Sequence, residues 1–494
     1  MRIASTLLEQ PPVLAEAHDT RAALRFVTCG SVDDGKSTLI GRLLVDSKAV
    51  LVDQLAGVQR GGQTDLALLT DGLQAEREQG ITIDVAYRYF NTAKRKFIIA
   101  DAPGHEQYTR NMVTAASSAD AAVVLVDATK LHWQTPSPEL LPQTRRHSLL
   151  VNLLRVPSIV FAVNKLDAVE DPALAFAHIS AALKNFAEKA RIPVTAIVPV
   201  SALIGFNVVD ANPGWCGYEG PGLLQILEHL HATPADTAHA FALPVQWVEK
   251  PAPTFGTGVS SLPPEGAVPP KGGLSAEVVA PTLVASRTSL PPEGAVPPKG
   301  GLSAERSSSS SDISQGRRIF WGRVASGAVQ PGQEITVMPG GKTARVAQVL
   351  DHTRQPKTVA AGHSGGVILD RELDVSRGDW LLAKGGFEPP LGIREITATV
   401  AWMDDEPLLP GRMYWALQGH RWVKAKVKRI VHHVDINTLE THDATQLDAN
   451  AIGVIELAFL EPVAALPYTQ SRVLGSMILV DTASHKTSAA VLVM

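Results

Sequence analysis

The sequence contains little cysteine, with only Cys29 and Cys216 among its 494 residues. Cys29 ends an apolar run and Cys216 lies in a glycine-rich stretch, so we expect no structural disulfide and a reducing compartment. An uninterrupted apolar run of about 18 residues, the length that crosses a bilayer, is also lacking. The N-terminal stretch carries Glu9, Glu16 and Asp19 where a signal peptide would be apolar. These absences predict a soluble, cytoplasmic protein without a membrane partner.

The chain also lacks a strong charge of one sign. Its formal net charge is -4 and its sequence pI is about 6.4. Without a basic field, we expect no nucleic acid as its main partner. At 52.6 kDa the chain is long for one hydrophobic core, so two or three domains are expected.

One glycine-bounded loop follows the apolar run Phe26–Cys29 and precedes a helical pattern. Its backbone N–H groups can converge on an anion at a helix N-terminus, while Lys36 reaches the outer phosphates and Ser37 offers a hydroxyl to Mg²⁺. The loop therefore predicts a site for a nucleoside triphosphate. Its phosphate-binding residues are Gly30, Ser31, Val32, Asp33, Asp34, Gly35, Lys36, Ser37 and Thr38.

A second stretch, Gly340–Thr343, ends like this loop but has Thr336 where the first glycine would stand. It lies between valine-rich runs. We interpret it as the turn of a β-hairpin.

Residues 23–240, after a polar lead-in at 1–22, alternate between β-branched runs and stretches with helical spacing such as Gln107–Ala119 and Pro172–Lys189. This alternation predicts a P-loop α/β domain with a mostly parallel sheet and helices on both faces. The predicted strands are Phe26–Cys29, Ile83–Phe90, Phe97–Ala100, Ala121–Val126, Ser158–Val163 and Thr195–Val200.

Further polar motifs each follow one of these strands, at the sheet edge where α/β proteins bind ligands. Each motif alone is a common turn or helix cap, but together and in this order they predict one nucleotide site. Their residues are Asp101, Ala102, Pro103, Gly104 and His105; then Asn164, Lys165, Leu166 and Asp167; then Ser201, Ala202 and Leu203.

The first motif and the segment before it suit the phosphate end of the site. Asp101 can hold Mg²⁺ through water, and the Gly104 N–H can face the γ-phosphate without an obstructing side chain. Thr82 follows a glycine, as a switch-loop ligand of Mg²⁺ would, and His105 is placed to orient the attacking water. For the nearby Glu76–Glu78 a solvated helix face and a functional role remain equally open.

The later motifs suit the base end. Asp167 can accept hydrogen bonds from the N1–H and 2-amino groups of guanine, which adenine lacks, so the sequence favours GTP over ATP. Asn164 and Lys165 would brace the phosphate loop and stack along the base. The Ala202 amide could donate to guanine O6.

From residue 241 the pattern changes to short strands between glycine and proline turns. We predict an antiparallel β-barrel at 241–385 and another at 386–494, in which the basic run Lys424–Arg429 is the polar face of a strand and not an RNA-binding stripe. The expected strands are Leu243–Val248, Ile319–Val324, Glu334–Met338, Ala344–Leu350, Gly366–Leu369, Ile396–Trp402, Trp422–His433, Ile452–Phe459 and Ser476–Val480.

A Pro/Gly/Ser-rich segment at about 252–312 interrupts the first barrel. Ser261–Glu277 recurs word for word at Ser289–Glu305, which indicates a recent duplication. This composition cannot bury a core, so we expect an acquired, disordered insertion in a barrel turn. A proline-rich docking site is the alternative.

The motifs resemble those of the translation-factor GTPase superfamily over residues 25–130. The particular residues within the motifs resemble those of the GTPase subunits of bacterial sulfate adenylyltransferase. Elongation factors of the Tu and 1A type usually have histidine where this chain has Ser31 and Asp34. The resemblance continues through Asp101–Ser117, Thr144–Ser148, Pro407–Arg412 and Val434–Glu440.

This resemblance implies a GTPase that uses GTP and Mg²⁺ and binds a separate catalytic ATP sulfurylase subunit, as a heterodimer or a higher oligomer of heterodimers. GTP hydrolysis would drive formation of adenosine 5′-phosphosulfate and diphosphate from ATP and sulfate. A fused adenylylsulfate kinase is not expected, because no second phosphate loop is present. The alternatives are an elongation-factor-type GTPase that delivers aminoacyl-tRNA, and a decayed copy disabled by the insertion.

Overall fold

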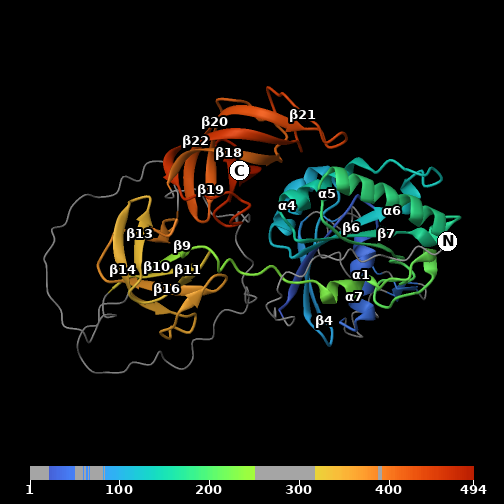
Figure 1. Cartoon of the computed structure of the whole chain (residues 1–494), viewed down its shortest axis with the longest axis horizontal. Coiled ribbons are helices and arrows are strands. Elements are labelled where there is room, and N and C mark those ends of the chain that lie inside the picture. The colour runs from blue at the N-terminus through green and yellow to red at the C-terminus, as the bar shows by residue number, and fades with distance from the viewer. Residues whose placement is uncertain are drawn as a thin grey trace. The chain divides into compact units, whose positions relative to one another are not determined.

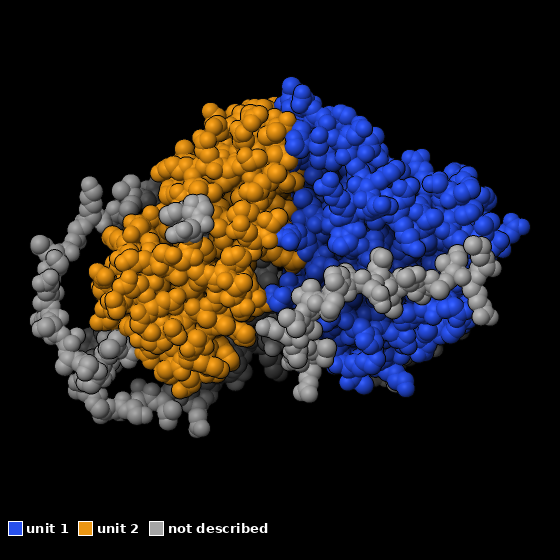
Figure 2. Space-filling view, in the orientation of Figure 1, with its two compact units in different colours: residues 1–234, 401–405, 432–453 blue, residues 235–400, 406–431, 454–494 orange. Residues whose placement is uncertain are grey.

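The computed structural model describes residues 22–49, 59–60, 63–64, 66, 82, 84–250, 317–387 and 392–494. Residues 1–21 of the lead-in, the run around Glu76–Glu78 and the repeat insertion lie outside the described residues. The chain divides into two compact units, residues 1–234, 401–405 and 432–453 in one and residues 235–400, 406–431 and 454–494 in the other (Figure 2). The domain boundaries expected from the sequence stay predictions.

The N-terminal unit contains a six-stranded sheet with the order β4-β5-β1-β6-β7-β8. All its neighbouring strands are parallel except β4 and β5. The prediction of a mostly parallel sheet is therefore confirmed. The strands are β1 Leu24–Cys29, β4 Ala86–Asn91, β5 Lys96–Asp101, β6 Ala121–Asp127, β7 Ser158–Asn164 and β8 Val194–Pro199.

Helices cover both faces of this sheet, as predicted. Figure 1 shows α1 and α7 on one side and α4, α5 and α6 on the other. Leu39 and Leu43 of α1 pack with Phe26 of β1 in a core that also includes Leu223 of α7. The bounds are α1 Lys36–Asp46, α4 Thr109–Ser117, α5 Pro142–Leu153, α6 Pro172–Lys189 and α7 Leu223–His229. Within the described part of the chain, every helix is too short or too polar to cross a membrane.

Two sequence expectations need correction at element boundaries. The predicted strand Ile83–Phe90 begins at Ala86 and is the antiparallel edge strand β4. The predicted single strand Leu243–Val248 is two strands, β9 Ala242–Pro244 and β10 Trp247–Glu249. Because β9 pairs with β17 and β10 pairs with β11, the chain changes partners just after Pro244, which has no N–H to donate.

The sheet of residues 242–383 has the order β10-β11-β16-β14-β13-β17-β9, and all its pairings are antiparallel. The hairpin expected at Gly340–Thr343 is confirmed, because Val337 pairs with Lys342 and Gly341 turns with a φ of +67°. The strands are β11 Ile319–Arg323, β13 Glu334–Met338, β14 Lys342–Leu350, β16 Ser364–Leu369 and β17 Trp380–Ala383, and β12 Ala328–Val329 pairs separately with β15 Val359–Ala360.

The C-terminal sheet, β19-β23-β24-β18-β22-β20-β21, closes into a barrel through an additional β19–β20 pairing. Along β20, Val423, Ala425 and Val427 are buried, while Lys428 and Arg429 pair with Glu395 and Glu456 at 2.9 and 2.6 Å. The basic run is therefore the outer face of a strand, as predicted. The strands are β18 Ile393–Trp402, β19 Met413–Gln418, β20 Arg421–Val434, β21 Thr441–His442, β22 Ile452–Val463, β23 Ser476–Asp481 and β24 Thr487–Val493.

Candidate nucleotide-binding site

The phosphate loop lies between the carboxyl end of β1 and the first residue of α1, Lys36. Gly35, the N-cap of this helix, has a φ of +91°, a conformation that favours glycine. The first turn of α1 carries no acidic side chain. The positive end of the helix dipole is thus open to an anion, and Ser37 and Thr38 lie in that turn.

Lys36 lies across this loop. Its ammonium donates to the carbonyl oxygens of Gly30 and Ser31 at 3.3 and 2.7 Å, and the residue is 7% exposed. Burial lowers the pKa of Lys36, while the negative charges of Asp34 and Asp101 oppose the shift. A phosphate oxygen at the loop would meet this cation in a dry environment.

Asp34 shapes the loop from inside. Its carboxylate is fully buried, accepts from the Ser31 N–H at 2.5 Å and from Lys130 Nζ at 3.1 Å, and burial raises its pKa against the attraction of Lys130 and Lys36. Lys130 also donates to the Val32 carbonyl. Lys130 was not foreseen, although its place shortly after the carboxyl end of β6 is a signal that could have found it.

The Asp101–Gly104 segment begins at the last residue of β5 and lies against the phosphate loop. Asp101 is 2% exposed and accepts from the Thr28 hydroxyl of β1 at 3.2 Å. A Cβ on Gly104 would come within 2.5 Å of Lys36 Nζ and 2.8 Å of the Gly30 carbonyl oxygen. Only glycine fits this approach, and Ala102 and Pro103 are buried beside it.

His105 is exposed directly after this segment. Its Nδ1 accepts from the Gln107 N–H at 3.3 Å and caps the short helix η2, Glu106–Tyr108. Its ring meets Tyr108 at an edge, with 6.1 Å between centroids. Thr82 is partly buried, but its neighbours 67–81 and 83 lie outside the described residues, so its role stays a prediction.

Asn164 joins the phosphate loop to the loop after β8. Its Nδ2 donates to the Asp34 carbonyl at 2.8 Å, and its Oδ1 accepts from the Ala202 N–H at 3.0 Å. Lys165 Nζ donates to the Asp33 carbonyl at 2.5 Å and pairs with Asp127 at 2.8 Å. Both side chains brace the phosphate loop in the structure.

The other residues predicted to contact the base differ in solvent exposure. Asp167 is exposed in the short helix η4, Leu166–Ala168, whereas the Leu166 side chain is in the core. Ser201 is buried and its hydroxyl accepts from the Ile204 N–H at 3.1 Å, while Leu203 is 68% exposed. The carboxylate of Asp167 is therefore available to a base.

The Ala202 amide, expected to donate to guanine O6, donates to Asn164 in the structure. Arg42 of α1 holds the same loop by donating to the carbonyls of Ala202 and Leu203. No sequence motif pointed to Arg42, because its role depends on tertiary packing.

His147 of α5 is a further residue that no motif assigned a role. Its Nδ1 accepts from the Gly30 N–H at 3.1 Å, and the side chain is 1% exposed. Burial, followed by the positive charges of Lys36 and Arg146, lowers the pKa of His147 to about 3. The imidazole is therefore neutral at physiological pH.

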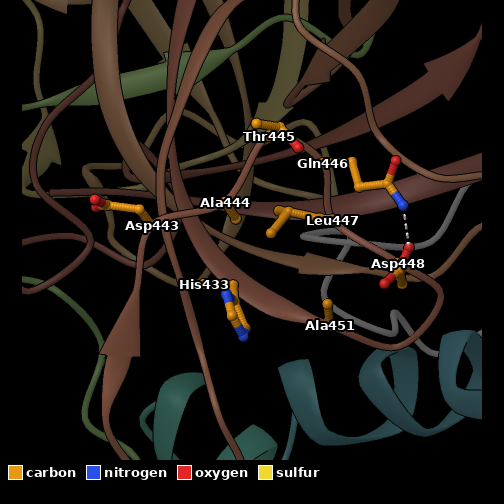
Figure 3. Close-up of a pocket in the computed structure, with 8 residues that line it drawn as sticks. All are labelled: His433, Asp443, Ala444, Thr445, Gln446, Leu447, Asp448 and Ala451. Carbon is orange, nitrogen blue, oxygen red and sulfur yellow. Dashed lines mark hydrogen bonds between the residues drawn. The ribbon is translucent and has the colours of Figure 1, made fainter.

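A separate pocket of about 400 Å³ lies in the segment 433–451 of the same compact unit (Figure 3). The described residues that line this pocket include no lysine or arginine, and they include none of the predicted nucleotide-site residues. It does not suit a triphosphate. Its lining residues are His433, Asp443, Ala444, Thr445, Gln446, Leu447, Asp448 and Ala451.

Comparisons with known proteins agree with this geometry. Residues 21–235 match the family model described as the elongation factor Tu GTP binding domain, and residues 395–494 match the GTP-eEF1A C-terminal domain-like family. The chain is 39% identical to sulfate adenylyltransferase subunit 1 of Laribacter hongkongensis, over 96% of this chain and 85% of that protein. The protein of the same name from Vibrio vulnificus is 40% identical, with 96% and 86% covered.

A longer relative is the bifunctional enzyme CysN/CysC of Xylella fastidiosa. It is 42% identical over 96% of this chain, and the match spans 66% of that protein's length.

Proposed function

Because the chain belongs to the family of sulfate adenylyltransferase subunit 1, a family of GTPases, we propose that its GTP hydrolysis drives sulfate activation on a separate catalytic subunit. That subunit would form adenosine 5′-phosphosulfate and diphosphate from ATP and sulfate, in a cytoplasmic heterodimer or a higher oligomer of heterodimers. The observation that carries the proposal is the close approach of Gly104 to Lys36 in the phosphate loop, a loop that Asn164 links to the base end.

At the phosphate end, backbone N–H groups of Val32–Thr38 and of Gly104 would hold the triphosphate, with Lys36 neutralising its outer oxygens. The N–H groups of Gly30 and Ser31 donate to His147 and Asp34 and so hold the loop itself. At the base end, Asp167 would read guanine through the N1–H and 2-amino groups. Asn164 and Lys165 would fix the position of the base end relative to the phosphate end, since each donates to the phosphate loop.

Ser37 and Asp101 offer oxygen atoms, the donors that Mg²⁺ prefers, and Asp101 is oriented by its hydrogen bond from Thr28. We assign these two residues and Thr82 to the ion, which when bound would neutralise developing charge on the transferred phosphoryl group. His105, exposed beside Gly104, would orient the attacking water.

Delivery of aminoacyl-tRNA is the less favoured function. The curated relatives named above take part in sulfate activation, and a chain with a net charge of -4 offers little attraction to the phosphate backbone of RNA. Tight tRNA binding with a steep salt dependence would favour that function instead.

The decisive experiment measures GTP hydrolysis by the whole chain with and without a bacterial ATP sulfurylase catalytic subunit, in the presence of ATP and sulfate. Stimulation together with adenosine 5′-phosphosulfate formation is expected, and Lys36→Ala should abolish both by removing GTP binding. A chain lacking residues 255–311 should behave equally if the insertion is neutral. If both the whole chain and the shortened chain bind GTP tightly but the catalytic subunit stimulates GTP hydrolysis in neither, the proposed coupling is contradicted.

A further inference from the structure

One face of α5 contacts both loops that line the phosphate end of the site. Gln143 Nε2 donates to the Gly104 carbonyl at 3.2 Å, and His147 Nδ1 accepts from the Gly30 N–H at 3.1 Å. Arg146, between them, donates to Glu106 and to the side-chain oxygen of Gln143, both at 2.7 Å. Residues three and four apart share one face of a helix, so this set acts from a single surface.

The contact with Gly30 fixes the start of the phosphate loop. Gly30 is buried with a φ of +150°, and a Cβ there would lie 2.9 Å from the Leu125 carbonyl oxygen. A buried N–H without a partner is unfavourable, and the partner that the structure supplies is a side chain 117 residues away. The conformation of the loop at Gly30 therefore depends on α5.

The contact with Gly104 acts on the second loop. The Gly104 carbonyl belongs to the peptide that leads into His105, so the hydrogen bond from Gln143 fixes the direction in which the chain enters η2. Arg146 also forms an ion pair with Glu106, the residue after His105. The same helix face thus holds the segment on which the proposed water-orienting histidine stands.

We propose that α5 sets the spacing between the two loops, with His147 positioning the phosphate loop for GTP binding and Gln143 positioning the Gly104–His105 segment for hydrolysis. This inference rests on the proposed nucleotide site. Neither residue touches the reacting atoms, so both are positioning residues. If His147 merely filled the core, only the volume of its side chain would matter for GTP binding. The proposed role requires, in addition, a hydrogen-bond acceptor at the δ position of the ring.

The test compares His147→Asn, whose Oδ1 can replace the ring Nδ1 as acceptor, with His147→Leu, which keeps the bulk and loses the acceptor. GTP and GDP dissociation constants are measured for the full chain with fluorescent nucleotide analogues. We expect His147→Leu to weaken binding by about tenfold or more, while His147→Asn stays within about threefold of the parent chain. Equal affinities for both variants and the parent chain would overturn the role of His147.

Gln143→Ala provides a second test, in which the substituted side chain is only partly buried and the hydrophobic core stays intact. Its GTP affinity should stay within about threefold, while single-turnover hydrolysis slows by about tenfold. Asn152→Ala, in the last turn of the same helix, is the matched control and should hydrolyse GTP like the parent chain. If both His147 variants fail to fold, an unchanged hydrolysis rate for Gln143→Ala overturns the proposal. Failure of the parent chain to bind GTP, or retained binding in Lys36→Ala, would instead contradict the nucleotide site itself.

Discussion

Lys130 and Asp34 form an ion pair at 3.1 Å, in which the Asp34 side chain is fully buried and the Lys130 side chain is 33% exposed. The pair ties Lys130, which follows β6, to the phosphate loop, because Asp34 also accepts from the Ser31 N–H and Lys130 donates to the Val32 carbonyl. Replacing Lys130 would leave a buried carboxylate without its nearest cation.

We therefore expect Lys130→Met to lower the free energy of unfolding by about 1 to 3 kcal/mol, less than for a wholly buried pair because water reaches the lysine. It should also weaken GTP binding through the altered loop. Urea unfolding and nucleotide titration measure the two effects, and Lys130→Arg, which keeps the charge, is the control. Unchanged stability in Lys130→Met would show that the pair is not a stabilising feature.

His105→Ala should keep GTP affinity and slow hydrolysis by about a hundredfold, because a group that orients water acts on the chemical step. Single-turnover hydrolysis and the GTP dissociation constant separate the two quantities. Tyr108→Phe, which keeps the ring beside His105, is the control. An unchanged turnover in His105→Ala would remove this residue from its proposed role.

Asp167→Asn should weaken binding of GTP and strengthen binding of xanthosine triphosphate. The amide can donate where the carboxylate can only accept, and xanthine presents an oxygen in place of the 2-amino group. Competition between the two nucleotides measures the switch, which we expect to exceed about tenfold. If the ratio of the two affinities does not change, Asp167 does not read the base.

His147 should make stability depend on pH. In the unfolded chain its pKa returns to about 6.5, while in the folded chain burial and the nearby positive charges of Lys36 and Arg146 lower it to about 3. Between these values the unfolded state binds the extra proton, so the free energy of unfolding falls as the pH falls, by at most about 1.4 kcal/mol per pH unit from this group. His147→Asn should lose this component.

The measurement is urea unfolding of both chains between pH 5 and pH 7.5. The difference between their free energies of unfolding should shrink as the pH falls below about 6.5. Parallel curves across the range would contradict a buried neutral imidazole.

The sequence predicts the proposed nucleotide site where the residues of that site come at the ends of strands. Asp101 and Asn164 end β5 and β7, so a pattern of apolar runs is sufficient to place them at one sheet edge. Lys130, Arg42 and His147 act through contacts with residues that are far away in the sequence. Contacts of this kind depend on packing between elements, which a local pattern does not encode.

The fold shows the same division. The eighteen residues of α6 have the bounds that helical spacing predicts, and Pro172 stands at the first position of the helix, where proline is well tolerated. The run Leu243–Val248 looks like one strand because Gln246 is its only polar residue, yet its halves pair with different neighbours. Partner choice is a tertiary property, so it could not be predicted from the run itself.

The pairing of β10 with β11 bears on how this chain could lengthen. Glu249 pairs with Ile319 in register, and Glu249 also accepts from the Trp321 indole N–H at 2.8 Å. The points at which the chain leaves and rejoins the sheet are therefore adjacent and fastened by the sheet's own bonds. For a flexible segment between such points, each doubling of length costs only about 0.6 kcal/mol of closure entropy. The entropy of closing the segment therefore weighs little against a duplication at this position, whatever the repeat does for function.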